Sequence, residues 1–205
     1  MSSSLFIKIC GLRTERDVEA AVRAGADAIG FVFAESPRRV DATTARDLAR
    51  AVPDDVLTVG VFRRQPLDEV RAVAETSGVR AVQLHGDEGS EYYAALSQSD
   101  RTLIRAVAAQ GQDRRHRCGE LGEDLLLLDA PAPGTGRAWD WAAPDFAPPE
   151  GRWLLAGGLT PENVREAVRR TAPWGVDVSS GVERARGIKD PDLIASFVDA
   201  ARAAE

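Results

Sequence analysis

The chain has few residues of the types that build metal sites or disulfide frameworks. Among its 205 residues are two cysteines, Cys10 and Cys118, and two histidines, His85 and His116. These residues are too few and too scattered to have the spacing of a metal site, so we expect no bound metal. One disulfide is possible on number alone, but so few cysteines are typical of a reducing, cytoplasmic location.

A long hydrophobic run and an excess of basic residues are also missing. No apolar stretch approaches the ~18 residues of a membrane span. The start, Met1-Ser2-Ser3-Ser4, has no basic region followed by an apolar one, so no signal peptide is expected. The net charge is -6 and the pI about 5.1, which excludes nucleic acid and anionic membranes as expected partners. The pairs Arg38-Arg39 and Arg63-Arg64 are then local features, by default solvated surface.

What the chain does contain is enough apolar material for one sizeable core. Its hydrophobic content is 44%, and its length predicts a single domain over residues 1–205. No linker, low-complexity tract or shift in composition divides it. Short β-rich runs alternate with amphipathic segments throughout. The predicted strands are Leu5–Cys10, Ala28–Phe33, Val56–Phe62, Ala81–His85, Thr102–Val107, Asp124–Asp129, Trp153–Ala156 and Val176–Ser179.

Helices are predicted between these strands, and three of them have recognisable start signals. Thr14 precedes Asp17 as an approximate capping box, and Thr160-Pro161 and Asp190-Pro191 place a capping side chain before a proline. The predicted helices are Thr14–Ala24, Thr43–Ala51, Leu67–Thr76, Glu162–Arg170 and Pro191–Ala203, with weaker ones near Gln112–Leu121 and Trp139–Phe146.

The strands start at intervals of roughly 25 residues, a rhythm typical of βα units and a parallel sheet. An open doubly wound sheet usually carries a glycine fingerprint after its first strand, and Cys10-Gly11-Leu12-Arg13 lacks it. Glycine-rich loops instead follow the last two strands, at Ala156–Leu159 and Asp177–Gly181. A (β/α)8 barrel commonly has its phosphate site there. The sequence therefore predicts an α/β fold, a single (β/α)8 TIM barrel with few insertions.

Cys10 ends the first predicted strand, and the active groups of such barrels lie at the carboxyl ends of strands. A free cysteine is also often simply a buried apolar residue. Lys8 lies on the same strand face one layer below, where its charge would favour the thiolate. An inward lysine needs a partner, and Asp177 on the last strand supplies a carboxylate. We therefore predict a Lys8–Asp177 ion pair with its charged atoms within ~4 Å.

Asp129 ends the apolar run Leu125–Leu128 at the same rim. It could cap the next segment, but no good helix begins there. A carboxyl at the rim of an apolar barrel loses solvation in its charged form, which suits a general acid near neutral pH. The segment Ala130–Arg137 is predicted to be a lid that hinges at Gly134 and Gly136, the alternative being a surface linker.

The loops after the last two strands have the residues of an anion site. Gly157 and Gly158 allow backbone N–H groups to approach a phosphate closely, and Ser180-Gly181 could start a short helix facing the same anion. A single Gly-Gly pair is common in strand-to-helix turns, so the signal is two such loops after consecutive strands. His85 would either hydrogen-bond the substrate or cap the turn at Asp87-Glu88.

Taken together, these motifs resemble phosphoribosylanthranilate isomerases. The matches extend over the whole chain and follow the order of the strands. Each is modest alone, but the set is highly specific. The matching segments are Lys8–Gly11, Gly30–Phe33, Ser36–Arg38, Val82–Gly86, Leu128-Asp129, Gly134–Gly136, Trp139–Trp141, Ala156–Leu159 and Val176–Glu183.

The resemblance implies an Amadori rearrangement, aldose to ketose, in tryptophan biosynthesis. The substrate would be N-(5'-phosphoribosyl)anthranilate and the product 1-(2-carboxyphenylamino)-1-deoxyribulose 5-phosphate, with no metal or cofactor. By the same resemblance Asp129 is the general acid, Cys10 the general base, and Arg38 the partner of the anthranilate carboxylate. His85 would bind substrate and Asp177 would lie near the ribose or the amino group. The implied phosphate site consists of Gly157, Gly158, Ser179, Ser180 and Gly181.

The chain departs from the family pattern in the predicted lid, where Pro133 replaces a usual glycine and the segment is slightly short. This departure bears on lid motion and leaves Cys10 and Asp129 in place. A sister phosphoribosyl isomerase of histidine biosynthesis is an alternative, but by resemblance that family has a carboxylate at the position of Cys10. A non-catalytic binding barrel is another, and the retention of both groups argues against it. The expected partner is a small phosphorylated molecule, and the chain would be a monomer or homodimer.

Overall fold

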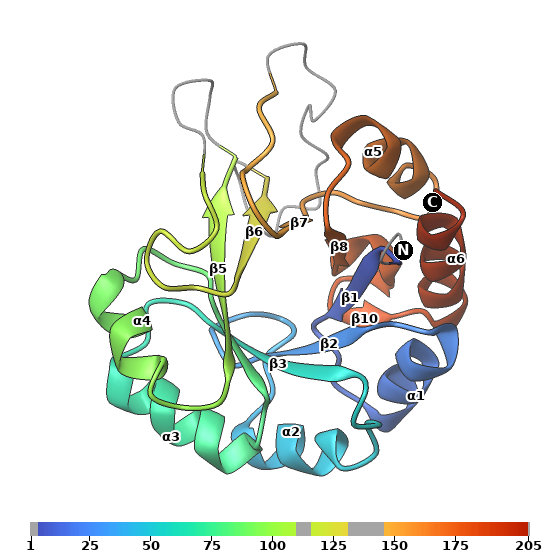
Figure 1. Cartoon of the computed structure of the whole chain (residues 1–205). Coiled ribbons are helices and arrows are strands. Elements are labelled where there is room, and N and C mark those ends of the chain that lie inside the picture. The colour runs from blue at the N-terminus through green and yellow to red at the C-terminus, as the bar shows by residue number, and fades with distance from the viewer. Residues whose placement is uncertain (1–3, 110–115, 131–145, 205) are drawn as a thin grey trace.

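The computed structural model describes residues 4–109, 116–130 and 146–204, and its centre is a closed barrel of eight parallel strands in sequence order (Figure 1). This confirms the predicted TIM barrel. Every strand boundary lies within one residue of its prediction. The strands are β1 Phe6–Cys10, β2 Ala28–Val32, β3 Leu57–Phe62, β4 Ala81–Leu84, β5 Thr102–Ala108, β6 Leu125–Asp129, β7 Trp153–Leu155 and β8 Gly175–Val178.

The barrel interior is filled because alternate residues of each strand point inward. The lower layers are apolar and buried, and they end upward in a few polar side chains at the carboxyl edge. Lys8 of β1 is paired in register with Asp177 of β8, and Gln83 of β4 is almost fully buried. The apolar interior cluster consists of Ala28, Val59, Ala81, Ile104, Ala106, Leu125, Leu127, Leu154 and Ala156.

Helices cover the outside of the barrel, and a larger apolar cluster fills the space between them and the strands. Two predicted caps are confirmed: Thr14 accepts a hydrogen bond from the Asp17 amide, and Asp190 accepts one from the Asp192 amide. Within the described ranges, no helix is long and apolar enough to cross a membrane. The helices are α1 Glu15–Ala24, α2 Ala42–Ala49, α3 Leu67–Ser77, α4 Ser90–Leu96, α5 Val164–Thr171 and α6 Pro191–Arg202.

Three helix predictions need correction. Thr160 does not cap a helix: α5 begins at Val164, because Asn163 accepts from the Thr160 amide and donates to the Gly158 carbonyl, which closes a turn first. The short helix α4 was not predicted, since its seven residues carry little periodicity. Residues 116–121 form a bridge and turns instead of a helix, while 112–115 and 139–145 lie outside the described residues.

A short hairpin after β8 was also not predicted. The single 3-10 turn η1 Ser180–Val182 leads into β9 Glu183–Ala185, which pairs antiparallel with β10 Ile188–Lys189. The two strands are too short to give a sequence pattern. The hairpin brings Glu183 and Lys189 to the carboxyl edge of the barrel, beside the site described next.

Candidate active site

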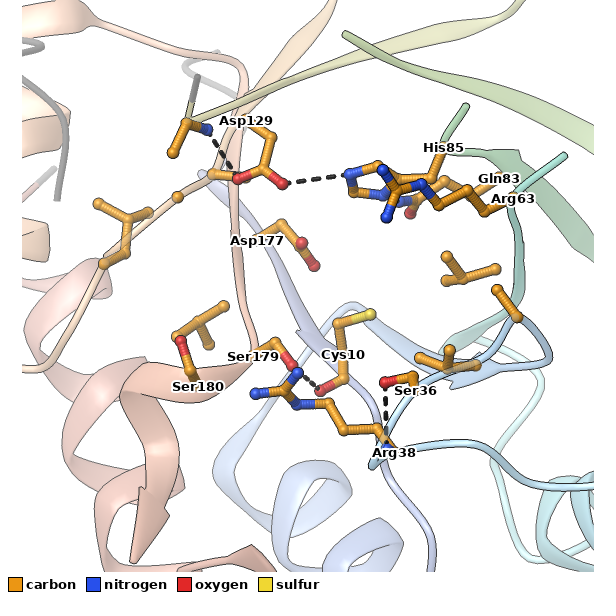
Figure 2. Close-up of a pocket in the computed structure, with 18 of the residues that line it drawn as sticks. Cys10, Ser36, Arg38, Arg63, Gln83, His85, Asp129, Asp177, Ser179 and Ser180 are labelled. Carbon is orange, nitrogen blue, oxygen red and sulfur yellow. Dashed lines mark hydrogen bonds and ion pairs between the residues drawn. The ribbon is translucent and has the colours of Figure 1, made fainter. Parts of the chain in front are cut away.

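One pocket lies at the carboxyl edge of the barrel, and most of the predicted site residues line it (Figure 2). Gly181 is the exception: a side chain there would lie 1.8 Å from the Leu159 carbonyl oxygen, so this glycine lets the loops after β7 and β8 touch. Arg63 and Gln83 also line the pocket and were not among the predicted site residues. The predicted residues in the lining are Cys10, Arg38, His85, Asp129, Gly157, Gly158, Asp177, Ser179 and Ser180.

Lys8 and Asp177 form the predicted ion pair, with 2.7 Å between the ammonium nitrogen and Oδ1. The parallel register of β1 and β8 sets the two side chains opposite each other. Burial lowers the pKa of Lys8, but the neighbouring Asp177 carboxylate outweighs burial and raises the pKa above its usual value. The lysine is therefore a fixed cation beneath the pocket.

Cys10 is buried at the end of β1, and both it and Cys118 are free thiols. We expected Lys8 to favour the thiolate, but burial raises the pKa of the Cys10 thiol and is the larger effect. Lys8 and Lys189 lower it, whereas Asp177 raises it and offsets the charge of Lys8. In the ligand-free site the thiol form is thus favoured.

Gly30 on β2 makes room for this thiol. A Cβ atom at that position would lie 2.9 Å from the Cys10 sulfur, closer than such atoms approach in proteins. The glycine in the Gly30–Phe33 segment therefore has a packing role at the site.

Asp129 has partners on both carboxylate oxygens. Oδ1 accepts from the Ala130 amide at 2.8 Å, and Oδ2 lies 3.1 Å from His85 Nε2. The side-chain amide nitrogen of Gln83 lies 2.9 Å from His85 Nδ1 and donates to it, so the imidazole proton is on Nε2 and is directed at Asp129. His85 thus orients Asp129, and no hydrogen bond joins it to the Asp87-Glu88 turn.

Arg38 is held by a carboxylate that the hairpin supplies. Its Nε and Nη2 atoms donate to Glu183 at 2.6 and 3.0 Å, a two-pronged pairing that fixes the plane of the guanidinium. Lys189 donates to Glu183 at 3.0 Å and to the Ser179 carbonyl at 2.8 Å. The Ser179 hydroxyl in turn donates to the Cys10 carbonyl at 3.1 Å. This network connects the loops after β1, β2 and β8.

Glu183 is the centre of that network, and its pKa is shifted accordingly. Burial raises the pKa, but hydrogen bonds from Arg38 and the charge of Lys189 outweigh burial and lower it from 4.5 to about 2. Burial is the largest effect on Lys189 and lowers its pKa, against the opposing attraction of Glu183. Glu183 therefore stays ionised, and it stabilises the fold most where its unfolded form is also ionised.

Glu183→Gln is expected to lower the free energy of unfolding by about 3–5 kcal/mol at neutral pH, because two buried cations lose their shared carboxylate. The wild-type carboxylate contributes fully above pH 4.5, and its contribution declines as the pH falls from 4.5 towards 2. The difference between variant and wild type should therefore shrink at acid pH. Urea unfolding followed by tryptophan fluorescence at several pH values measures it.

The control for this experiment is Glu75→Gln. Its side chain is 80% exposed and pairs with Arg101 at the surface, so the change should cost under about 1 kcal/mol. A Glu183→Gln difference that stays constant down to about pH 3 would contradict the ionised network.

The loop after β7 fits closely against β6. Gly157 and Gly158 have φ angles of 85° and 70°, a region that favours glycine. A Cβ atom at Gly157 would lie 2.5 Å from the Ala130 nitrogen and 2.9 Å from Asp129 Oδ1. The loop thus presents bare backbone directly beside the carboxyl group of Asp129.

The part of the pocket formed by β2 and β3 is apolar. Val32, Ala34 and Val61 are buried and form one cluster with Cys10. The pocket therefore combines a thiol, a carboxyl group, loops suited to an anion and an apolar wall suited to a ring.

Comparison with known proteins identifies close relatives. The family model of "N-(5'phosphoribosyl)anthranilate (PRA) isomerase" matches residues 7–200. An N-(5'-phosphoribosyl)anthranilate isomerase from Geotalea daltonii is 42% identical over 96% of each chain. The crystal structure of TrpF from Jonesia denitrificans is 44% identical and covers 98% of each chain with a TM-score of 0.86.

Two further solved structures carry information on ligand and assembly. A phosphoribosyl anthranilate isomerase in complex with reduced 1-(o-carboxyphenylamino)-1-deoxyribulose 5-phosphate is 32% identical, covers 97% of this chain and 99% of its own, and has a TM-score of 0.79. The isomerase from Thermotoga maritima is described as dimeric; a monomeric form of it is 32% identical, with a TM-score of 0.77, over 96% of this chain and 98% of that one.

Proposed function

Because the chain belongs to the N-(5'-phosphoribosyl)anthranilate isomerase family, we propose that it moves the protons of this isomerisation with Asp129 and Cys10. The enzyme isomerises N-(5'-phosphoribosyl)anthranilate in tryptophan biosynthesis. The observation that supports the two roles is the placement of one carboxyl group and one thiol in the same pocket, at the ends of β6 and β1.

Asp129 is the general acid of the first step. Its proton goes to the ribose ring oxygen as the bond from that oxygen to C1' breaks, and the nitrogen lone pair forms the C=N bond of a Schiff base. His85 and the Ala130 amide fix the direction of the carboxyl group, which is the condition for efficient transfer.

Cys10 is the general base of the second step. The Schiff base acidifies the proton on C2', and the Cys10 thiolate removes it to give an enolamine. The enolamine takes up a proton and tautomerises to the ketose, 1-(2-carboxyphenylamino)-1-deoxyribulose 5-phosphate. Lys8 and Lys189 are the cations that favour the thiolate against burial.

The remaining residues bind the substrate. The phosphate lies on Gly157, Gly158, Ser179 and Ser180, with Gly181 shaping the loop, because glycine-rich loops bring backbone N–H groups close to an anion. Asp177 lies on the floor of the pocket, towards the ribose or the amino group. Arg38 interacts with the anthranilate carboxylate through the part of its guanidinium that Glu183 leaves unbound.

Turnover of the natural substrate is the first test. Phosphoribosylanthranilate generated in the cuvette should lose its anthranilate fluorescence when the purified protein is added, and the ketose should appear by chromatography. The control is the same mixture without the protein. Absence of turnover, with inorganic phosphate still bound, would overturn the proposal and favour the sister isomerase with an imidazole-type substrate.

A further inference from the structure

Arg63 is a basic residue of the pocket that the steps above do not use. It follows directly after β3, on the inward strand face that also carries Val61, and its side chain lies beside His85 (Figure 2). Within the described part of the chain, no hydrogen bond or ion pair engages its guanidinium. The neighbouring Arg64 is different, because its Nε atom pairs with Asp87 at 2.6 Å.

The position of β3 in the barrel places Arg63 far from the phosphate loops. In a closed barrel of eight strands in sequence order, β3 and β7 are four strands apart and lie opposite each other. Gly157 and Gly158 follow β7, so Arg63 faces them across the mouth of the pocket. The wall next to Arg63 is the apolar cluster of Val32, Ala34 and Val61.

Arg38, the other cation in the lining, is already committed. Two of its nitrogens are bound to Glu183, and its side chain lies close to Gly11 and Ser179, on the side of the β8 loop (Figure 2). A ligand with its phosphate on the loops after β7 and β8 would therefore direct its other end towards the apolar wall and Arg63.

We propose that Arg63 binds the carboxylate on the aromatic ring of the substrate and so selects carboxylated arylamines. The substrate has one anion at each end, a phosphate and an aryl carboxylate, joined by the ribose and the ring. The guanidinium of Arg63 matches a carboxylate in shape and charge, and the apolar wall receives the ring. This inference rests on the proposed function and adds a specificity-determining residue to it.

The test compares two substrates, N-(5'-phosphoribosyl)anthranilate and N-(5'-phosphoribosyl)aniline, which lacks the carboxylate. Arg63→Gln should lower kcat/KM for the anthranilate substrate about tenfold, mainly through KM, as expected for loss of one charged hydrogen-bonded contact. The same variant should treat the aniline substrate as the wild type does. Product formation measured by chromatography gives both values.

Arg64→Gln is the matched control, since it removes the adjacent arginine whose ion pair points to Asp87. It should resemble the wild type with both substrates. An Arg63→Gln variant that keeps the wild-type preference for the carboxylated substrate would overturn the proposal and leave the carboxylate to Arg38. An equal loss with both substrates would also overturn it. Failure of the wild type to turn over either substrate would instead refute the proposed function.

Discussion

Asp129→Asn is expected to lower kcat by about 10²–10⁴-fold, the usual contribution of a proton-transfer group. Asparagine has nearly the same shape as aspartate but cannot supply an acidic proton to the ribose oxygen. Its side-chain oxygen can still accept the Ala130 amide, so the local structure should survive. Steady-state fluorescence assays on both proteins measure the effect, and a similar KM would show that binding is retained.

Asp87→Asn serves as the control for this change. Asp87 is at the same rim, but its side chain is 75% exposed and pairs with Arg64. Its replacement should leave kcat unchanged. If Asp129→Asn kept most of the wild-type rate while remaining folded by circular dichroism, Asp129 would not be the general acid.

Cys10→Ser should cause a loss in kcat of similar size, about 10²–10⁴-fold. A hydroxyl occupies nearly the same space beside Gly30, but it ionises far less readily than a thiol and cannot take the C2' proton. Cys118→Ser is the matched control, because that thiol is also free and lies outside the pocket lining. A Cys10→Ser enzyme with near-normal turnover would rule out the thiolate as base.

The pH dependence of the wild type provides a second readout on Cys10. Burial, the largest effect, raises the pKa of the thiol; Lys8 and Lys189 oppose it, and Asp177 adds to it. Because the base is the ionised form, kcat/KM should rise from neutral pH to about pH 9 as the thiolate fraction increases. Iodoacetamide labelling in the Cys118→Ser background should follow the same curve. A flat profile for both would contradict a buried thiol as the base.

The strand boundaries and one buried contact were predictable because both are local in origin or fixed by strand register. Apolar β-rich runs at a steady spacing predicted the barrel, and strand alternation placed Lys8 one layer below Cys10. Parallel closure then required Lys8 and Asp177 to face each other, as they do at 2.7 Å. The cap at Asp190 was correct for the same reason, since a cap depends on three neighbouring residues.

The start of α5 was not predictable from the cap signal alone. Thr160-Pro161 has the residue types of a helix start, but the side chain of Asn163 binds the Thr160 amide and the Gly158 carbonyl, and the helix begins later. Two competing local hydrogen-bond arrangements were available, and the packing of the β7 loop against β6 favours one of them.

By itself, the sequence determined the βα order, the single barrel, the family, and the placement of Cys10 and Asp129 at strand ends, because these depend on spacing along the chain. Only the tertiary structure decided how the site is supported: Glu183 on Arg38, Gln83 behind His85, and Arg63 facing the phosphate loops. Arg38 and Glu183 are 145 residues apart, and no local pattern records such a pairing. It forms because closing the barrel brings distant loops together and buries their charges, and a buried charge must find a partner.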